Sequence, residues 1–96
     1  MDELDGYDWD AANVGHILRH AGTPFEVEEV LSRRHVTIGG KTVAGERRWK
    51  SFGKTASGRY LVVVFTIRHG RLRTVTAYEM NVVERKIYAP EIDESL

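Results

Sequence analysis

The stretch SGRYLVVVFTIRHGRLRTVTAY, residues 57–78, decides the fold of this chain. Leu61–Ile67 is an apolar and β-branched run, long enough for a strand that is buried on both faces. His69-Gly70 follows as a two-residue turn signal, because glycine readily takes the positive φ that such turns need. Arg71–Tyr78 has the pattern of a returning strand. The stretch therefore predicts a central β-hairpin.

The register of this hairpin follows if Arg68 pairs with Arg71. Successive strand residues point to opposite faces, so we expect Arg71 and Arg73 on one face and Tyr78 on the other. Arginines at the open end of a hairpin fit a basic binding face and fit a solubilised sheet edge equally well. The expected pairs include Ile67 with Leu72, Thr66 with Arg73, Phe65 with Thr74, Val64 with Val75, Val62 with Ala77 and Leu61 with Tyr78.

Two capping signals predict helices before the hairpin. Asp10 is a suitable N-cap for a helix that runs to about His20. Thr23, followed by Pro24 and Glu26, predicts a second helix that ends near residues 32–33. The turn between the two helices is short, so we expect a helical hairpin on one face of the sheet.

Further strands and one last helix complete the prediction. Residues 35–38 and 46–52 are expected to be strands separated by a flexible loop over 39–45, which gives an antiparallel meander. Asn81, with Glu84 three residues later, predicts a helix that ends before Pro90. The expected fold class is α+β: two N-terminal helices on an antiparallel sheet of about four strands, with a C-terminal helix. We expect one domain over 1–96, with frayed tails at 1–6 and 90–96.

Composition limits the class of protein. The chain has no cysteine, which excludes disulfides and thiolate metal sites. Its acidic start and a longest apolar run of seven residues predict no signal peptide and no membrane span, so we expect a cytoplasmic protein.

The zero net charge hides a strong segregation of charge. Residues 1–30 carry eight acidic side chains and one arginine, residues 31–88 carry thirteen Lys and Arg with three Glu, and residues 89–96 carry three acidic side chains. This pattern indicates a basic surface for a polyanion or an acidic partner, unless the blocks interleave in space and cancel.

Most catalytic motifs are missing. His16 and His20 have a spacing that suits a metal ion on a helix, but no third ligand accompanies them, so we predict no metal site and no cofactor. GGKTVAG, residues 39–45, lacks the spacing of a phosphate-binding loop. Arginines with aromatic neighbours remain. They suit metal-free RNA cleavage, which needs a proton acceptor, cations at the phosphate and planar groups for bases, and they suit plain RNA or acidic-protein binding as well.

Six motifs follow one another across residues 7–88. They are Trp9-Asp10-x-x-Asn13-x-x-His16-Ile17-x-x-His20, Thr23-Pro24-x-Glu26-Val27-Glu28-Glu29-Val30, Arg48-x-x-x-Phe52-Gly53, Gly58-Arg59-Tyr60-Leu61-Val62-Val63-Val64, Arg73-x-Val75-Thr76-Ala77 and Glu84-Arg85-x-x-Tyr88. In this order they resemble the BrnT family, the toxin half of a bacterial type II toxin–antitoxin pair. The resemblance implies a fold similar to RelE and ParE toxins, metal-independent endoribonuclease activity, translation arrest, and neutralisation by a cognate antitoxin of ribbon-helix-helix type, through which alone the toxin meets DNA.

The resemblance also suggests roles for individual residues. Arg48 and Arg73 are the candidates for contact with the scissile phosphate of an RNA substrate. His20 or Glu84 is the candidate for proton transfer. The remaining candidates for binding RNA or the antitoxin are Arg47, Arg59, Arg71, Tyr78, Arg85 and Tyr88.

Other functions stay open. Tyr78 stands where many relatives have arginine, so a non-catalytic module that serves as antitoxin partner or co-repressor is one alternative. A stand-alone RNA-binding domain is another, and it predicts salt-sensitive RNA affinity without cleavage.

Overall fold

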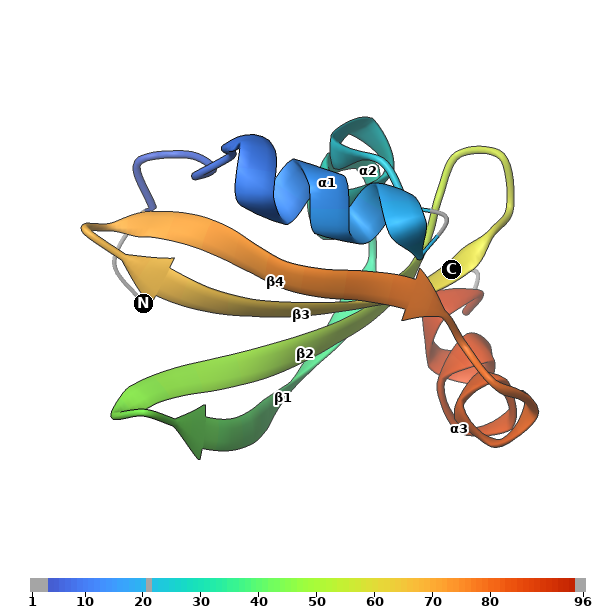
Figure 1. Ribbon diagram of the computed structural model, residues 1–96. Helices are drawn as coiled ribbons and strands as arrows, with labels where there is room; N and C mark the ends of the chain where they lie inside the picture. Colours follow the sequence, from blue (N-terminus) through green and yellow to red (C-terminus); the bar gives the residue numbers. More distant parts are fainter. Residues whose placement is uncertain (1–3, 21, 95–96) are drawn as a thin grey trace.

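A four-stranded antiparallel sheet forms the centre of the computed structural model, which describes residues 4–20 and 22–94 (Figure 1). The strands are β1 (His35–Val43), β2 (Glu46–Lys54), β3 (Tyr60–Arg68) and β4 (Arg71–Glu79), and they lie in the order β1-β2-β3-β4. With three helices in addition, the predicted α+β class and the predicted meander are confirmed.

Two tight turns join the outer pairs of strands. His69 and Gly70 have φ values of 51° and 76°, so the predicted hairpin turn is confirmed, with a left-handed backbone at both positions. Ala44 and Gly45 have φ values of 51° and 78° and form a second turn of the same kind. The predicted loop over 39–45 is therefore wrong. β1 continues through both glycines to Val43, and an irregularity in its pairing lies between Gly39 and Thr42.

A β-bulge in β4 changes the predicted register. Near the turn, Arg68 pairs with Arg71 and Thr66 with Arg73, as expected. The register then shifts between Phe65 and Val64, which leaves Val75 as the extra residue. The predicted pairs Val64–Val75, Val62–Ala77 and Leu61–Tyr78 are wrong. The observed pairs are Val64–Thr76, Val63–Ala77, Val62–Tyr78 and Leu61–Glu79.

The bulge also moves Tyr78 to the other face. Val62 and Thr66 lie an even number of residues apart on β3, so their side chains share a face. Their partners, Tyr78 and Arg73, therefore share that face too. The expectation that Tyr78 and Arg73 lie on opposite faces is wrong.

Helices α1 (Ala11–Arg19) and α2 (Pro24–Ser32) cover one face of the sheet (Figure 1). Their N-caps are Asp10 and Thr23, as predicted. The main core forms where their apolar residues meet the strands, and it contains Ile17, Val27, Val30, Leu61, Val63, Phe65, Leu72 and Ala77.

Helix α3 (Val82–Ile92) lies on the opposite face and covers one half of it (Figure 1). Asn81 and Glu84 form the predicted capping box. The helix passes through Pro90, so the predicted end before Pro90 is wrong. The reason is packing, because Ile92 is buried in a second core with Phe52 and Val62.

The segment before α1 runs along β4. Asp5 N donates to Gly70 O at 2.7 Å, Leu72 N to Gly6 O at 2.9 Å, and Asp8 N to Leu72 O at 2.8 Å. At the other end, Asp93 forms an ion pair with Lys54. Residues 4–6 and 90–94, expected to be frayed, are thus bonded to the sheet or helical. Residues 1–3 and 95–96 of the expected tails lie outside the described residues.

Candidate functional site

The half of the sheet face that α3 leaves open carries five cationic side chains, which we call the basic face. Lys50 pairs with Val64, Thr66 with Arg73, and Arg68 with Arg71, and the alternation of strand residues places all of these on one side of the sheet. Arg48 is two residues before Lys50 and belongs to the same side. The basic face consists of Arg48, Lys50, Arg68, Arg71 and Arg73.

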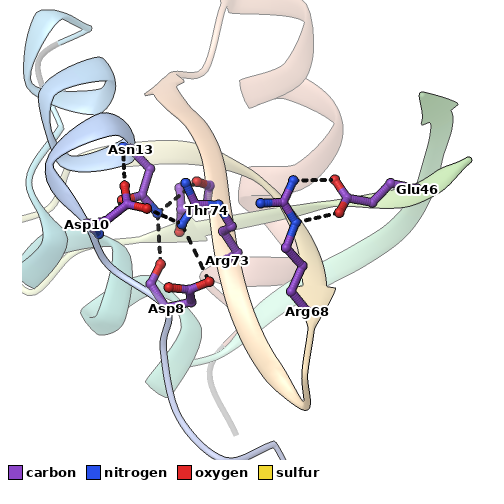
Figure 2. Close-up of polar contacts among 7 residues, drawn as sticks. All are labelled: Asp8, Asp10, Asn13, Glu46, Arg68, Arg73 and Thr74. Atoms are coloured by element: carbon purple, nitrogen blue, oxygen red, sulfur yellow. Dashed lines mark hydrogen bonds and ion pairs between the residues drawn. The ribbon is translucent and has the colours of Figure 1, made fainter. Parts of the chain in front are cut away.

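One carboxylate of β2 lies among these cations. Arg68 donates from Nε to Glu46 Oε2 at 2.6 Å and from Nη2 to Oε1 at 3.2 Å (Figure 2). These hydrogen bonds lower the pKa of Glu46, and the charges of Arg68, Arg48 and Arg73 lower it further. Glu46 is therefore ionised at neutral pH, bonded to Arg68 and stabilised by the charges of Arg48 and Arg73.

Arg73 is held by the segment that precedes α1. Its Nη1 lies 2.8 Å from Asp10 Oδ2 and 3.5 Å from Asp8 Oδ2 (Figure 2). The Arg73 side chain is only 15% exposed. The bond from Arg73 lowers the pKa of Asp10, and the same contact raises the pKa of Arg73, so this pair stays charged across the physiological range.

Asn13 connects this segment to β4 through hydrogen bonds. Its Nδ2 donates to Asp8 O at 2.8 Å and to Thr74 O at 3.2 Å, while its Oδ1 accepts from Asp10 N at 2.8 Å. The Asn13 side chain is buried, so each of these bonds is shielded from water. The backbone around Asp10 consequently has a fixed position relative to Arg73.

Arg48 differs from Arg68 and Arg73 because none of the ion pairs among the described residues includes it. Its Nε is buried and forms no hydrogen bond in the part of the chain that the structure describes. Buried donors of this kind are rare in native proteins, and a ligand is one way in which they are satisfied. Arg48 is thus the member of the basic face whose buried Nε would gain a hydrogen bond from an acceptor on a ligand.

The two other predicted catalytic residues lie elsewhere. His20 is the exposed C-cap of α1, and its ring lies tilted by 48° against that of His16, with 4.8 Å between the centroids. Glu84 accepts from Asn81 N at 2.9 Å and from the Tyr78 hydroxyl at 3.4 Å. No hydrogen bond or ion pair within residues 4–20 and 22–94 joins either residue to the basic face. The structure therefore brings Arg48 and Arg73 together and leaves His20 and Glu84 apart from them.

The predicted binding residues are spread over several surfaces. Arg71 belongs to the basic face, and Arg47 lies over the Trp49 ring at 5.3 Å. Arg59 forms ion pairs with Glu26 at 2.5 Å and Glu79 at 3.3 Å.

The other three predicted binding residues, Arg85, Tyr88 and Tyr78, lie near α3. Arg85 lies over the Tyr60 ring at 4.4 Å, Tyr88 stacks on Phe52 at 3.7 Å, and Tyr78 packs against the second core. Tyr88 and Tyr78 are half-buried and contribute to the fold.

Sequence reasoning missed Glu46 and Arg68 as members of the site. The signal was present, because Glu46 precedes Arg48 by two residues and shares its face in a regular strand. For Arg68, the sequence predicted only the pairing with Arg71 and not the ion pair with Glu46.

A concavity lies on the opposite face. It has a volume of about 730 Å³ and is lined mainly by apolar side chains, among them Trp49, Phe65 and Leu72. His35 is the one histidine among its lining residues. This groove therefore lacks the cations and carboxylates that the basic face brings together.

Metal-binding clusters and membrane-spanning helices are both absent from the described residues. No group of three or more His, Cys, Asp or Glu side chains among them is arranged to hold a metal ion. None of the helices that the structure describes has the length and apolar character needed to cross a bilayer.

Comparison with known proteins identifies the family. No curated protein matches the chain significantly. The family model described as the ribonuclease toxin BrnT of a type II toxin–antitoxin system matches residues 9–84, a range that includes all of the basic face and both carboxylates of residues 10 and 46. The resemblance seen in the sequence is thereby confirmed, and this chain belongs to the BrnT family of ribonuclease toxins.

Proposed function

We propose that this chain is a metal-independent endoribonuclease that acts in the cytoplasm and arrests translation. The observation that supports this most is the basic face, on which Arg68 binds an ionised Glu46 and Arg48 and Arg73 share the same open side of the sheet. Such a face attracts a phosphodiester and supplies donors to the charge that develops on it during cleavage.

The cleavage step uses the 2′-hydroxyl of the RNA itself. Its oxygen attacks the adjacent phosphorus, the bond from phosphorus to the 5′ oxygen breaks, and the products carry a 2′,3′-cyclic phosphate and a 5′-hydroxyl. Arg48 and Arg73 contact the scissile phosphate. Glu46 accepts the proton from the 2′-hydroxyl, and the departing 5′ oxygen takes a proton from water.

Glu46 suits the role of proton acceptor better than His20 or Glu84. A general base must lie within reach of the proton that it removes, and geometry comes before pKa in choosing one. Glu46 lies among the arginines proposed to bind the phosphate, whereas Glu84 is engaged in the capping box of α3.

Tyr78 does not weaken the proposal. It pairs with Val62, four residues along β3 from Thr66, the partner of Arg73. Tyr78 and Arg73 are thus separated by about 13 Å along the strand at 3.3 Å per residue. The aromatic side chain replaces a cation under α3 and leaves the basic face intact.

Neutralisation by a cognate antitoxin is part of the proposal. The family description names a toxin–antitoxin system, which supports a protein partner encoded with the toxin. We expect that antitoxin to be of ribbon-helix-helix type, so that the toxin meets DNA only through it.

The test is cleavage of RNA by purified protein in the presence of EDTA. We expect cleavage of an RNA oligonucleotide with a cyclic phosphate product, and none of an oligonucleotide with 2′-deoxyribose throughout. Arg48→Ala is the informative variant, because Arg48 forms no ion pair with any residue that the structure describes, so its loss breaks none of them. Arg33→Ala, an exposed arginine away from the basic face, is the matched control.

Expression of Arg48→Ala and Arg33→Ala in bacterial cells gives a second test. Induction of the wild type and of Arg33→Ala should stop growth and fragment RNA, whereas Arg48→Ala should do neither. Folded wild-type protein that binds RNA without cleaving it would overturn the proposal in favour of an RNA-binding domain. Folded protein that neither binds nor cleaves RNA would favour a non-catalytic antitoxin partner.

A further inference from the structure

Asp10 makes two contacts that join the start of α1 to Arg73. Its Oδ1 accepts a hydrogen bond from Asn13 N at 3.1 Å, and this bond makes Asp10 the N-cap of the helix. Its Oδ2 lies 2.8 Å from Arg73 Nη1 (Figure 2). The carboxylate is planar and its first oxygen is fixed by the helix, so the second oxygen has a defined position as well.

Asn13 makes this position rigid relative to β4. The bond from Asn13 Nδ2 to Thr74 O, at 3.2 Å, reaches the residue next to Arg73 in the strand. The bond from Asp10 N to Asn13 Oδ1 closes the capping box from the other side. The carboxylate of Asp10 and the backbone of Arg73 are therefore parts of one hydrogen-bonded unit.

The two carboxylates occupy only one corner of the guanidinium group. Asp8 and Asp10 both approach Nη1. Nε and Nη2 of Arg73 form no hydrogen bond within the described residues. A guanidinium group has five donors in a fixed plane, and a pair of its nitrogens can bind two phosphate oxygens at once. The Nε–Nη2 edge is thus engaged by none of the described residues, while the contacts at Nη1 fix the plane.

Two negative charges beside Arg73 also oppose the binding of RNA. A site arranged only for affinity would omit them, because every neutralised cation lowers the attraction of a phosphate. Their presence is explained if orientation during the reaction matters more than affinity.

We propose that Asp10 is a positioning residue for RNA cleavage, which orients the guanidinium group of Arg73 toward the transition state and weakens RNA binding in doing so. This inference rests on the proposed function. It assigns Asp10 a role in the reaction in addition to its role as the N-cap of α1.

Asp10→Asn is the variant that tests it. Asparagine caps helices as well as aspartate does, so α1 keeps its start while the charge is lost. We expect the single-turnover cleavage rate to fall by about 10- to 100-fold, because misplacing a catalytic group by about 1 Å has effects of this size. Affinity for a 2′-deoxy oligonucleotide should be equal or tighter, because one repulsive charge is gone.

Two further variants serve as controls. Glu29→Gln makes the same charge change on α2, where no hydrogen bond or ion pair of that side chain is described, and should leave the cleavage rate unchanged. Arg73→Lys keeps the charge and lacks the planar fork, so it should lose cleavage to a similar extent as Asp10→Asn. Asp10→Ser retains a capping oxygen and replaces Asp10→Asn if that variant does not fold.

A direct readout is the Nε–Hε resonance of Arg73 in NMR spectra. We expect one sharp signal in the wild type and a broadened signal in Asp10→Asn. A folded Asp10→Asn protein with unchanged or faster cleavage would overturn the inference. Failure of the wild type to cleave RNA would instead overturn the proposed function, and the resonance would still show whether Asp10 orders Arg73.

Discussion

Tyr88 stacks on Phe52 with 3.7 Å between ring centroids and 15° between ring planes, and this contact anchors α3 to β2. It joins the second core, in which Val62 and Ile92 are buried. A residue that sequence reasoning assigned to RNA or antitoxin binding thus holds the last helix on the sheet.

Tyr88→Ala should destabilise the fold by about 2–3 kcal/mol, because large-to-small changes at packed aromatic positions have effects near this size and Tyr88 is only partly buried. Urea unfolding monitored by circular dichroism measures this loss. Tyr88→Phe keeps the stacked ring and should be within about 0.5 kcal/mol of the wild type. Equal stability of Tyr88→Ala and wild type would show that the stacking contact does not anchor α3.

Glu46→Gln should lower the cleavage rate by about 100-fold or more, which is the usual contribution of a general base. Added formate should restore part of the activity of Glu46→Ala, since a small carboxylate can replace the missing one. Glu79→Gln removes a carboxylate from another ion pair of the sheet and is the control. Loss of cleavage without rescue, matched by Arg68→Ala, would mean that Glu46 only holds Arg68.

The Asp93–Lys54 pair should stabilise the fold over a defined pH range. Lys54 Nζ lies 2.7 Å from Asp93 Oδ1, and the Tyr60 hydroxyl donates to the same carboxylate. The bond to Lys54 lowers the pKa of Asp93 below its usual 3.8 and raises the pKa of Lys54 above its usual 10.5. A depressed carboxyl pKa adds stability above pH 3.8 that is lost as pH falls through the depressed value. A raised lysine pKa adds stability below pH 10.5 that is lost as pH rises through the raised value.

Asp93→Asn measures this contribution. Its difference in unfolding free energy from the wild type should be largest near neutral pH and should shrink as the pH falls below 3.8 or rises above 10.5. A difference that stays constant with pH would assign the effect to the hydrogen bond from Tyr60 and not to charge.

Gly53→Ala should destabilise the protein by about 1–3 kcal/mol, as overpacking of a filled interior does. A Cβ at this position would lie 2.7 Å from Val30 Cγ1 and 3.2 Å from His35 Cβ, so α2 would have to move away from β2. Gly15→Ala is the matched control, because a Cβ there meets nothing within 4 Å and alanine favours a helix interior by about 1 kcal/mol. A neutral Gly53→Ala would show that α2 tolerates displacement from the sheet.

Local chemistry allowed much of the fold to be predicted. The caps Asp10, Thr23 and Asn81 and the turn at His69-Gly70 depend on residues that are neighbours in sequence, and all of these predictions are confirmed. The errors depend on distant contacts. Burial of Ile92 against Phe52 carries α3 past Pro90, and pairing with β2 keeps β1 extended through Gly39 and Gly40.

The site was predicted only in part, for the same reason. The hairpin register placed Arg73 opposite Thr66, and the structure confirms this pair. The partners Asp8 and Asp10 of Arg73 are more than sixty residues away in sequence, so no pattern of spacing could indicate them. The untested roles of His20 and Glu84 remain predictions of the resemblance.

The extra residue Val75 has a consequence for comparing members of the family. Because β4 changes phase there, Ala77 lies toward α1 and Tyr78 toward α3. Loss of Val75 alone would remove the bulge and leave Ala77 and Tyr78 on their own sides, whereas regular pairing without that loss would exchange them. A relative whose β4 is one residue shorter should therefore be aligned with its gap at Val75, and its small and aromatic residues should keep the order seen here.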